Sequence, residues 1–556
     1  MLCDCGGKSR DVVPREREAG GASSLEAGAA GEAACSDCSG AGGHAGDDTG
    51  GAPGAGNVGA AGDRSRGGEA GETPSEPGSG GESGDGAGHG GAAGREHAEA
   101  GTAGDGVSGE GATPLAPVTL ASVRAYQAVE VVLAQGDAAV ATRNAPLIAG
   151  RAAMLRGFVT APPAITPREL VGRLSLVNLE SATLLESRVT VSGASEEGKL
   201  DSTFVFQVGA AQVTTDLEWS LTLEEADGEV IARFPSQGTA ALGATDASGV
   251  LELTMVPMLA NGFTPDLSPA ALERYLTYAR ATFPVPDVIA TVREAVTLDF
   301  PVESDGTGLT QALDRLYEVR EADAPADNVY YYGVLTPSAT FEEYCELGCT
   351  VGLASIANPN NVYYRGGIGT GYFVNAADTT SQETLVHELG HAMGRGHSPC
   401  GTDDSSFFPY TGGSIGVWGY DGAVLRNPSR FSDVMGYCLP VWISDYTYAG
   451  LFNRIAHVNA TASARLLGDD EKRRYRRLIV DHDGALRWGS ESETAPPDTT
   501  TSVELTLSSS ASPEPELVRV AYAPFDHLPG GFALVPAELL VPGVRVAFGN
   551  AAVDVP

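Results

Sequence analysis

The chain contains 556 residues and carries a formal net charge of −37, from 35 basic and 72 acidic residues. This length is enough for about three or four domains of ordinary size. The charge argues against nucleic acid as a partner and against docking on anionic lipid, because both depend on clustered Lys and Arg. No apolar run reaches the ~18 residues that a membrane-spanning helix needs, so none is expected.

Residues 1–115 differ in composition from the rest of the chain. They hold 19 acidic and 7 basic residues and no aromatic residue, and 33 of the 72 glycines lie in residues 1–120. Such a segment buries too little apolar surface to offset the entropy lost on ordering. We therefore expect a disordered, flexible tether here, without secondary structure.

The cysteines bear on the location of the protein. Eight cysteines in a strongly acidic chain favour an oxidising environment, extracellular or at the cell surface, with buried free thiols as the alternative. The N-terminus shows neither the charged nor the apolar region of a secretory signal. One interpretation is a lipoprotein whose start lies further upstream, with the lipid on Cys3 or Cys5. A plain N-terminus is the other, and a lipid anchor is the only membrane contact expected.

Three further segments follow the tail. Residues 116–254 alternate apolar and polar residues, which predicts a β-sandwich of about seven strands. Residues 255–463 combine helical spacing at 269–283 and 309–319 with strand-like segments, so we expect an α+β domain. Its strands are expected at residues 288–296, 328–334, 351–357 and 367–373. Residues 464–556 return to short strands and predict a small C-terminal β domain.

One motif carries the chemistry of the chain. Residues 387–397 have the pattern H-E-x-x-H-x-x-G-x-x-H, which residue frequencies alone would produce in only about one chain in 10⁵ of this length. Its defining residues are His387, Glu388, His391, Gly394 and His397.

The spacing of this motif suits a helix that ends at its glycine. Residues 380–383 (TSQE) predict a capping box at the start of the helix. His387 and His391 are one turn apart and share a face, and Gly394 can adopt the left-handed conformation that ends the helix. His397 then follows the turn. The opposite face is apolar and is expected in the core, through Leu385, Leu389, Ala392 and Met393.

Three neutral imidazoles predict one catalytic Zn²⁺ ion with a fourth position left for water. Zinc lowers the pKa of bound water toward neutrality, and Glu388 can accept the proton and pass it to a leaving amine. A structural three-histidine site, or core histidines satisfied by hydrogen bonds, are the alternatives.

The motif resembles that of the metzincin clan of zinc endopeptidases, in which it is followed by a methionine-containing turn. Met435 lies 38 residues after His397, in the segment DVMGY. The resemblance implies that Met435 forms a hydrophobic floor under the metal and that Tyr437 approaches the zinc or steadies an oxyanion. Asp433 stands where many metzincins have Ser, which leaves the subfamily open.

Residues 412–421 and 438–448 extend the resemblance. They are similar to segments of the secreted bacterial mucinase-type metalloproteases, also called the ToxR-regulated lipoprotein peptidase family, and the similarity covers roughly residues 328–458. It implies a metzincin-like catalytic domain with a mixed, twisted sheet, acting on extracellular proteins, with glycoproteins among the candidate substrates.

Metzincins bind substrate as an additional antiparallel strand at a sheet edge. The candidate edge here is formed by Gly352, Leu353, Ala354 and Ser355, with residues 367–373 as the next strand inward. A buried central strand is the alternative reading of the same residues.

The cysteines outside the tail are candidates for disulfides. A bridge between Cys400 and Cys438 would close a loop of about 38 residues and contribute ~4 kcal/mol to stability. Cys345 and Cys349 would then form a local bridge, although sequence does not distinguish the three possible pairings. The remaining histidines of this region are isolated, and we expect structural or exposed roles for His457, His482 and His527.

The sequence thus predicts a monomeric, extracellular or surface-tethered zinc endopeptidase of the metzincin type. The alternative is a surface adhesin or glycan-binding protein whose β domains bind the ligand and whose protease centre is vestigial.

Overall fold

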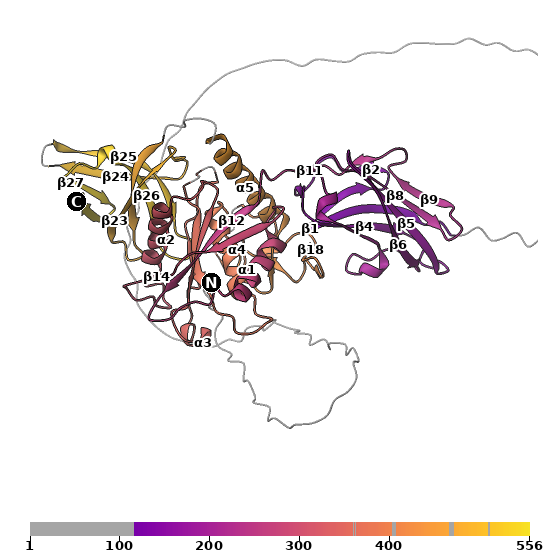
Figure 1. Cartoon of the computed structure of the whole chain (residues 1–556), viewed down its shortest axis with the longest axis horizontal. Coiled ribbons are helices and arrows are strands. Elements are labelled where there is room, and N and C mark those ends of the chain that lie inside the picture. The colour runs from indigo at the N-terminus through magenta and orange to yellow at the C-terminus, as the bar shows by residue number, and fades with distance from the viewer. Residues whose placement is uncertain (1–115, 360, 362, 403–406, 466–471, 510–511) are drawn as a thin grey trace, which may run out of the picture. The chain divides into compact units, whose positions relative to one another are not determined.

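The computed structural model describes residues 116–556, apart from residues 360, 362, 403–406, 466–471 and 510–511. The tail that was predicted to be a tether, residues 1–115, lies outside the described residues. The described part of the chain is rich in β-strands and has few helices (Figure 1).

The first two sheets are built mainly from residues 119–241. The first has the strand order β19-β18-β1-β4-β7, with β2 beside β1, and the second has the order β10-β8-β5-β6, with β9 beside β8. Alternating residues of facing strands, such as Leu174, Phe204 and Leu221, are fully buried in one apolar cluster. The bounds in the first sheet are β1 (Thr119–Gln135), β2 (Ala138–Ala139), β4 (Ala153–Thr160), β7 (Phe204–Val208), β18 (Gly419–Tyr420) and β19 (Leu425–Arg426). Those in the second are β5 (Arg168–Val177), β6 (Ala182–Val191), β8 (Glu218–Glu225), β9 (Val230–Phe234) and β10 (Ala240–Ala241).

Strands from the later part of the chain extend the first sheet. β18 pairs antiparallel with β1 through Tyr420 and Ala128, and the Trp442 indole donates a hydrogen bond of 2.9 Å to the Ala128 carbonyl oxygen. The first sheet is therefore completed by residues that sequence assigned to the α+β domain.

A third sheet carries the helix with the histidine motif. Its strand order is β13-β12-β15-β17-β16, with β14 beside β12, and all its pairings are parallel except that of β16 with β17. The strands are β12 (Leu251–Leu259), β13 (Val288–Val292), β14 (Val296–Thr297), β15 (Tyr330–Leu335), β16 (Gly352–Ala354) and β17 (Gly366–Thr370). The helices are α1 (Pro269–Thr282), α2 (Leu309–Asp323), α3 (Phe341–Tyr344), α4 (Thr380–Ala392) and α5 (Asp445–Arg465).

The two faces of this sheet are covered by different helices. Met255 and Tyr332 belong to the apolar cluster that includes residues of α1 and α4, whereas Met258 and Leu335 belong to the cluster that includes residues of α2. This follows from the period-two alternation of side chains along a strand. Because both faces are covered, β15 is buried along its whole length.

Several sequence-based boundaries differ from the structure. The expected strand at 288–296 is two short strands, β13 and β14, which pair with different parts of β12. The helix predicted at 309–319 continues to Asp323. β12 itself crosses the predicted boundary between residues 254 and 255, because its residues supply the middle of the sheet.

The capping box predicted at residues 380–383 is wrong. The N-cap is Thr379, and its hydroxyl donates to the Glu383 carboxylate at 2.7 Å instead of accepting a backbone N–H. Asp378 serves the helix start, because its Oδ1 accepts both the N–H and the hydroxyl of Thr380, at 3.1 and 2.8 Å. The other end agrees with the sequence, since Gly394 has a φ of +84° directly after the helix.

The C-terminal sheet has the order β23-β22-β26-β25-β24-β27-β28. Phe525, directly after β25, and Phe532 of β26 share an apolar cluster with Tyr317 of α2. Beside them, buried Arg477 donates to Asp314 at 2.6 Å and to Glu321 at 2.9 Å, both on α2. Its strands are β22 (Arg473–Val480), β23 (Leu486–Thr494), β24 (Ser502–Ser509), β25 (Ser512–Pro524), β26 (Gly531–Pro536), β27 (Val544–Phe548) and β28 (Ala551–Asp554).

Two further pairs of short strands complete the list of sheets among the described residues. One pairs β3 (Leu147–Ile148) with β11 (Ala244–Thr245), and the other pairs β20 (Ser432–Asp433) with β21 (Val441–Trp442).

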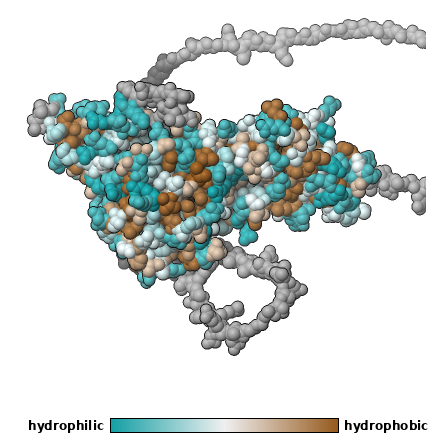
Figure 2. Space-filling view, in the orientation of Figure 1, coloured by the Kyte–Doolittle hydropathy of each residue, from teal (hydrophilic) through white to brown (hydrophobic). Residues whose placement is uncertain are grey.

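The visible surface is mainly hydrophilic, with separate hydrophobic areas (Figure 2). Strongly exposed apolar side chains come from different segments, as with Leu179 at 93% and Leu347 at 96% exposure. Among the described residues, no helix has both the length and the apolar character needed to cross a membrane.

Candidate metal centre

Helix α4 places two imidazoles against each other. His387 and His391 are 5% and 0% exposed, and their Nε2 atoms lie 3.0 Å apart. The apolar residues on the opposite side of the helix, including Leu385 and Leu389, are fully buried in the core. The apolar face of the helix therefore packs in the core, while the opposite face directs both imidazoles toward the same place. The four-residue spacing of the two histidines predicts this arrangement.

The hydrogen bonds of these rings assign their tautomers. His387 Nδ1 lies 2.7 Å from the Val434 carbonyl oxygen, and His391 Nδ1 lies 2.6 Å from that of Arg395. A carbonyl oxygen only accepts, so each Nδ1 carries the hydrogen and each Nε2 presents a lone pair. Two lone pairs that face each other at this distance fit a shared cation, and tetrahedral zinc would hold ligand nitrogens about 3.3 Å apart.

His397 joins the pair after the turn at Gly394. Its ring centroid lies 5.4 Å from that of His387 and 4.6 Å from that of His391. Burial lowers the pKa of His391 to about 4 and that of His397 to about 2. Burial also holds the pKa of His387 well below its usual value. All three rings are therefore neutral at pH 7, which is the form that binds a metal.

Glu388 lies beside the histidines in a confined space. Its side chain is 1% exposed, and its Oε2 makes no hydrogen bond among the described residues. Burial, together with the Asp526 carboxylate, raises the pKa of Glu388 to about 8. A cavity of about 10 Å³ is bounded by His387 and Glu388, room for roughly one water molecule. The arrangement puts an unpartnered carboxyl oxygen beside the His387 imidazole.

Two glycines make room for Glu388. A Cβ on Gly352 would overlap the Glu388 carboxylate, and one on Gly367 would lie 2.9 Å from Glu388 Cβ. β16 and β17 therefore need glycine where they pass the helix. The sequence shows these glycines but not what they face, since the contact joins segments far apart in the chain.

The methionine turn lies directly under α4. A Cβ on Gly390 would stand 2.5 Å from Met435 Sδ, so only glycine allows this approach. Asp433 fixes the turn, because its Oδ1 accepts the Met435 N–H at 2.8 Å and its Oδ2 accepts the Ser444 N–H at 2.9 Å. Asp433, the residue that departs from the metzincin pattern, is thus buried and stabilises the turn through these two hydrogen bonds.

Tyr437 contacts the third imidazole. Its hydroxyl lies 3.0 Å from His397 Nε2 and 2.6 Å from His527 Nδ1. Burial, with the nearby Asp526 and Glu388 carboxylates, raises the pKa of Tyr437, so the hydroxyl keeps its proton. The phenol is available as a hydrogen-bond donor within the centre.

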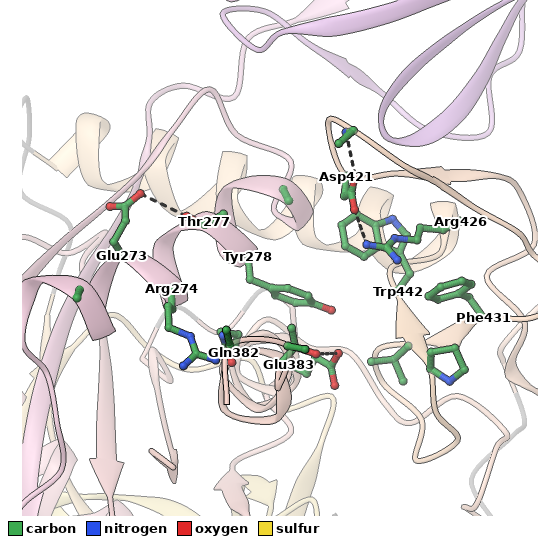
Figure 3. A pocket seen from close by; sticks show the side chains of 18 residues that line it. Glu273, Arg274, Thr277, Tyr278, Gln382, Glu383, Asp421, Arg426, Phe431 and Trp442 are labelled. Atoms are coloured by element: carbon green, nitrogen blue, oxygen red, sulfur yellow. Dashed lines mark hydrogen bonds and ion pairs between the residues drawn. The ribbon is translucent and has the colours of Figure 1, made fainter. Parts of the chain in front are cut away.

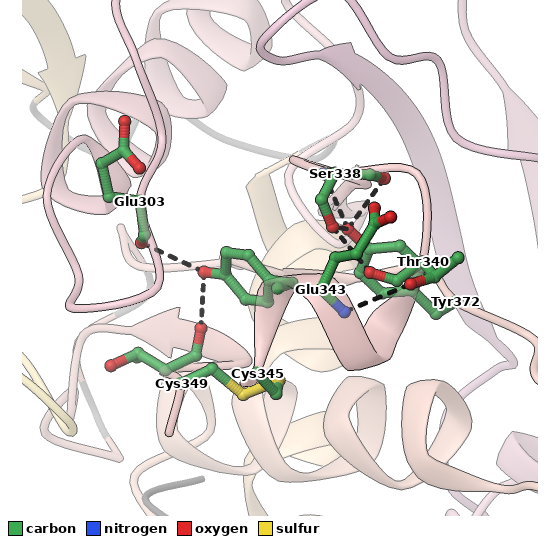
Figure 4. The surroundings of a disulfide bond; sticks show 9 residues. Glu303, Ser338, Thr340, Glu343, Cys345, Cys349 and Tyr372 are labelled. Carbon is green, nitrogen blue, oxygen red and sulfur yellow. Dashed lines mark hydrogen bonds between the residues drawn. A yellow bond between two sulfur atoms is a disulfide. The ribbon is translucent and has the colours of Figure 1, made fainter. Parts of the chain in front are cut away.

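Two disulfides flank this region. Cys400–Cys438 joins the loop after His397 to the end of the methionine turn, where the Tyr437 N–H also donates 2.8 Å to the Cys400 carbonyl oxygen. Cys345–Cys349 lies just before β16 (Figure 4). Next to it the Tyr344 hydroxyl donates to the Thr350 carbonyl oxygen at 2.9 Å, which fixes the approach to that strand.

The prediction that His527 is an isolated structural or exposed residue is wrong. His527, in the turn between β25 and β26, stacks on His387 with ring centroids 5.2 Å apart and an interplanar angle of 14°. Its Nε2 lies 3.2 Å from Glu388 Oε1 and 2.9 Å from Asp526 Oδ2. His457 and His482 are not part of the centre: His457 is exposed, and His482 is half-buried.

Asp526 was not a sequence candidate at all. Its side chain is 0% exposed, and its Oδ2 lies 2.9 Å from His527 Nε2 and 3.4 Å from His391 Nε2. Although burial favours the neutral acid, His527 and His391 hold the pKa of Asp526 well below its usual value. The group whose ligand atoms lie within 4.8 Å of one another comprises His387, His391, His397, Asp526 and His527.

The predicted substrate edge is at the end of its sheet but is covered. β16 is terminal and antiparallel to β17, with Leu353 opposite Ile368. Its outward groups are used: the Ala354 N–H donates to Asp526 Oδ1 at 3.0 Å, and the Ile356 N–H donates to the Pro524 carbonyl oxygen at 2.8 Å. The expectation of an open edge is therefore corrected, because the β25–β26 turn occupies it. Gly352, Leu353, Ala354 and Ser355 are all buried.

A larger pocket lies beside the start of α4, on the other side of Glu383 from the histidines. Its volume is about 680 Å³, and none of the histidines of the centre lines it. Figure 3 shows the Tyr278 ring in the middle of this pocket, with Glu383 on one side and Arg426 and Trp442 on another. The Tyr278 hydroxyl and Gln382 Oε1 are buried there without a hydrogen-bond partner among the described residues. This pocket is separate from the metal centre.

Comparison with known proteins agrees with the chemistry of the centre. Residues 348–434 match the family model described as Peptidase M66, which supports a metallopeptidase family. The match includes the three histidines and Glu388. No curated protein matches the chain. One similar solved structure is a cycloisomaltooligosaccharide glucanotransferase of Paenibacillus sp. complexed with cycloisomaltoheptaose, at 12% identity and a TM-score of 0.15. The match covers 40% of this chain and 28% of that enzyme, so this chain spans less than a third of its length.

Proposed function

We propose that the chain is a zinc-dependent endopeptidase of the metzincin type that hydrolyses peptide bonds of extracellular proteins. The observation that carries this proposal is the pair of Nε2 lone pairs that face each other at 3.0 Å. His397 adds a third neutral imidazole, and Glu388 lines a small cavity together with His387. The match to a peptidase family over the same residues supports the assignment.

His387, His391 and His397 would hold the zinc ion, with their Nδ1 hydrogen bonds fixing two of the rings. A bound zinc ion would supply Lewis acidity, which polarises the scissile carbonyl and makes water acidic enough to attack near neutral pH. The side chains around the metal would then carry out the proton transfers.

Glu388 would act as general base and then as general acid. Its carboxylate would take a proton from the water whose oxygen bonds to the carbonyl carbon. It would then deliver that proton to the amine nitrogen as the C–N bond breaks. Tyr437 would donate its hydroxyl hydrogen to the developing oxyanion. No acyl-enzyme forms in this scheme, because water attacks directly.

The setting of the enzyme is also part of the proposal. The two disulfides fit an extracellular protein. We propose a monomer that acts on proteins, glycoproteins among them, and that contacts membrane only through an N-terminal lipid. The complete set of ligands with its carboxylate favours a working peptidase over an adhesin with a vestigial centre.

The test compares the chain with Glu388→Gln for zinc content and for cleavage of casein and mucin. Both chains should bind one zinc ion, because Glu388 is not among the proposed ligands. Cleavage by the parent chain should stop with a chelator and return with zinc. The variant should be slower by at least a hundredfold, or about 3 kcal/mol in the barrier. Equal cleavage by the variant would refute the role of Glu388, and a chain that takes up no zinc would refute the proposal.

A further inference from the structure

The turn between β25 and β26, residues 524–530, reaches the metal centre from another sheet. Its backbone pairs with the outer side of β16 through an antiparallel bridge between Ser355 and Phe525. The Ala354 carbonyl oxygen also accepts the Asp526 N–H at 3.3 Å. This is the position and direction in which an extended peptide adds to a sheet edge. The turn therefore stands where a substrate strand would bind.

The same turn places a carboxylate against the imidazoles. Asp526 Oδ2 is buried and lies 2.9 Å from His527 Nε2 of the same turn and 3.4 Å from the Nε2 of His391, which presents its lone pair. A buried anionic oxygen is costly unless it is paired with a cation, and a metal ion held by the imidazoles would be such a cation. Carboxylate oxygen is also a common zinc ligand, so the fourth ligand position has an occupant from the chain itself.

The turn also contacts Glu388, the proposed general base. His527 Nε2 lies 3.2 Å from Glu388 Oε1, and its Nδ1 lies 2.6 Å from the Tyr437 hydroxyl. A residue that assisted hydrolysis would leave the substrate edge and the base accessible. The 524–530 turn instead contacts the edge, the metal ligands, the base and the phenol together.

The turn is anchored in the core. Phe525 is 5% exposed and packs edge-on against Phe532, with ring centroids 4.9 Å apart. The Phe525 N–H donates to the Gly530 carbonyl oxygen at 3.1 Å and closes the turn. Pro529, at its tip, is exposed. The contact with the centre is therefore a packed feature of the fold.

We propose that the 524–530 turn is a built-in inhibitor of this centre. Asp526 serves as the fourth metal ligand, and the backbone of the turn fills the substrate position. This inference rests on the proposed function for its meaning as regulation. Hydrolysis by the folded chain is therefore slow, because it requires that the turn leave β16.

The test uses a ligand that reports the open metal position without catalysis. Acetohydroxamate is titrated into the full chain loaded with cobalt(II), and the visible absorption is followed. The parent chain is compared with Asp526→Ala/His527→Ala and with Asp526→Asn, which keeps an amide oxygen for the Ala354 N–H. Asp483→Asn, in an exposed turn of the same sheet, is the matched control. Circular dichroism and thermal unfolding establish that each variant is folded.

The double variant should bind acetohydroxamate at least tenfold more tightly than the parent chain, with Asp526→Asn between them and Asp483→Asn unchanged. Its casein cleavage with zinc should be at least tenfold faster. Equal hydroxamate affinity in the parent chain and the double variant would overturn the proposal. Slower cleavage by a folded double variant would also overturn it, because Asp526 and His527 would then assist the reaction. If no chain cleaves casein, the proposed function fails, while the hydroxamate result still decides whether the turn closes the metal position.

Discussion

His387 Nδ1 donates a hydrogen bond of 2.7 Å to the carbonyl oxygen of Val434, 47 residues further along the chain. This bond ties the first imidazole of the motif helix to the methionine turn. Asp433 holds the methionine turn through its own hydrogen bonds. The orientation of the His387 ring therefore depends on the Asp433 carboxylate, although the two side chains do not contact each other. Removing such an outer partner commonly lowers metal affinity 10- to 100-fold.

Asp433→Asn should weaken both the turn and the metal centre. In the native chain the two carboxylate oxygens accept the backbone N–H groups of Met435 and Ser444. An asparagine amide has only one oxygen, so its NH₂ group must face one of these two N–H groups, and that hydrogen bond is lost. We expect unfolding to become easier by about 1–3 kcal/mol in urea. Zinc affinity, measured by competition with a chromophoric chelator, should fall at least tenfold. Unchanged zinc affinity would show that Asp433 does not act on His387.

Gly352→Ala should disable the base and leave the metal ligands in place. The added methyl group would overlap the Glu388 carboxylate, which must move. Overpacking of this kind costs ~1–3 kcal/mol. Casein cleavage should fall at least tenfold while zinc is still bound at one ion per chain. Gly193→Ala is the control, because a Cβ there meets nothing within 4 Å.

The two disulfides should contribute unequally to stability. Cys400–Cys438 spans 38 residues and Cys345–Cys349 spans 4. On the chain-entropy relation, replacing both cysteines of the long bridge by serine should cost about 4 kcal/mol, against roughly 2 kcal/mol for the short one. Urea unfolding of the two double variants measures the difference. A larger loss from the short bridge would mean that its effect on the start of β16 outweighs loop entropy.

Arg477→Met should be strongly destabilising. Arg477 is fully buried and donates to Asp314 and Glu321, so its removal leaves Glu321 without its cation and Asp314 with Arg487 alone. Breaking such a pair from one side typically costs ~3–5 kcal/mol. Arg545→Met provides the contrast, since the Arg545–Asp554 pair is 55% and 73% exposed and should be worth less than ~1 kcal/mol. Equal losses in urea unfolding would contradict this account of the Arg477 network.

The local part of the centre was predictable from sequence because it follows from helix geometry. Residues four apart on a helix share a face, so His387 and His391 had to meet once the helix formed. Gly394 ends that helix as its position predicts. The apolar face of α4 was also readable, because its period of 3.6 is local.

The remainder depends on contacts between distant segments. Asp526 and His527 stand in an ordinary-looking β-turn, more than 125 residues after the motif. Their role arises from the packing of one sheet against another, which no local pattern encodes. The closed edge at Ala354 was missed for the same reason. The predicted capping box was wrong for a local reason: the Thr380 N–H, which the Glu383 side chain would accept in a capping box, donates to Asp378 instead.

The Arg477 network bears on how this protein can be divided for expression. A chain that stops after α5 would keep the motif helix and every residue matched by the family model. It would also strip Asp314 and Glu321 of their guanidinium and uncover Tyr317 and its apolar neighbours on α2. The fragment would then expose an apolar surface beside two carboxylates that have lost their partners, so we expect it to aggregate. Useful fragments should retain the last strands through residue 556.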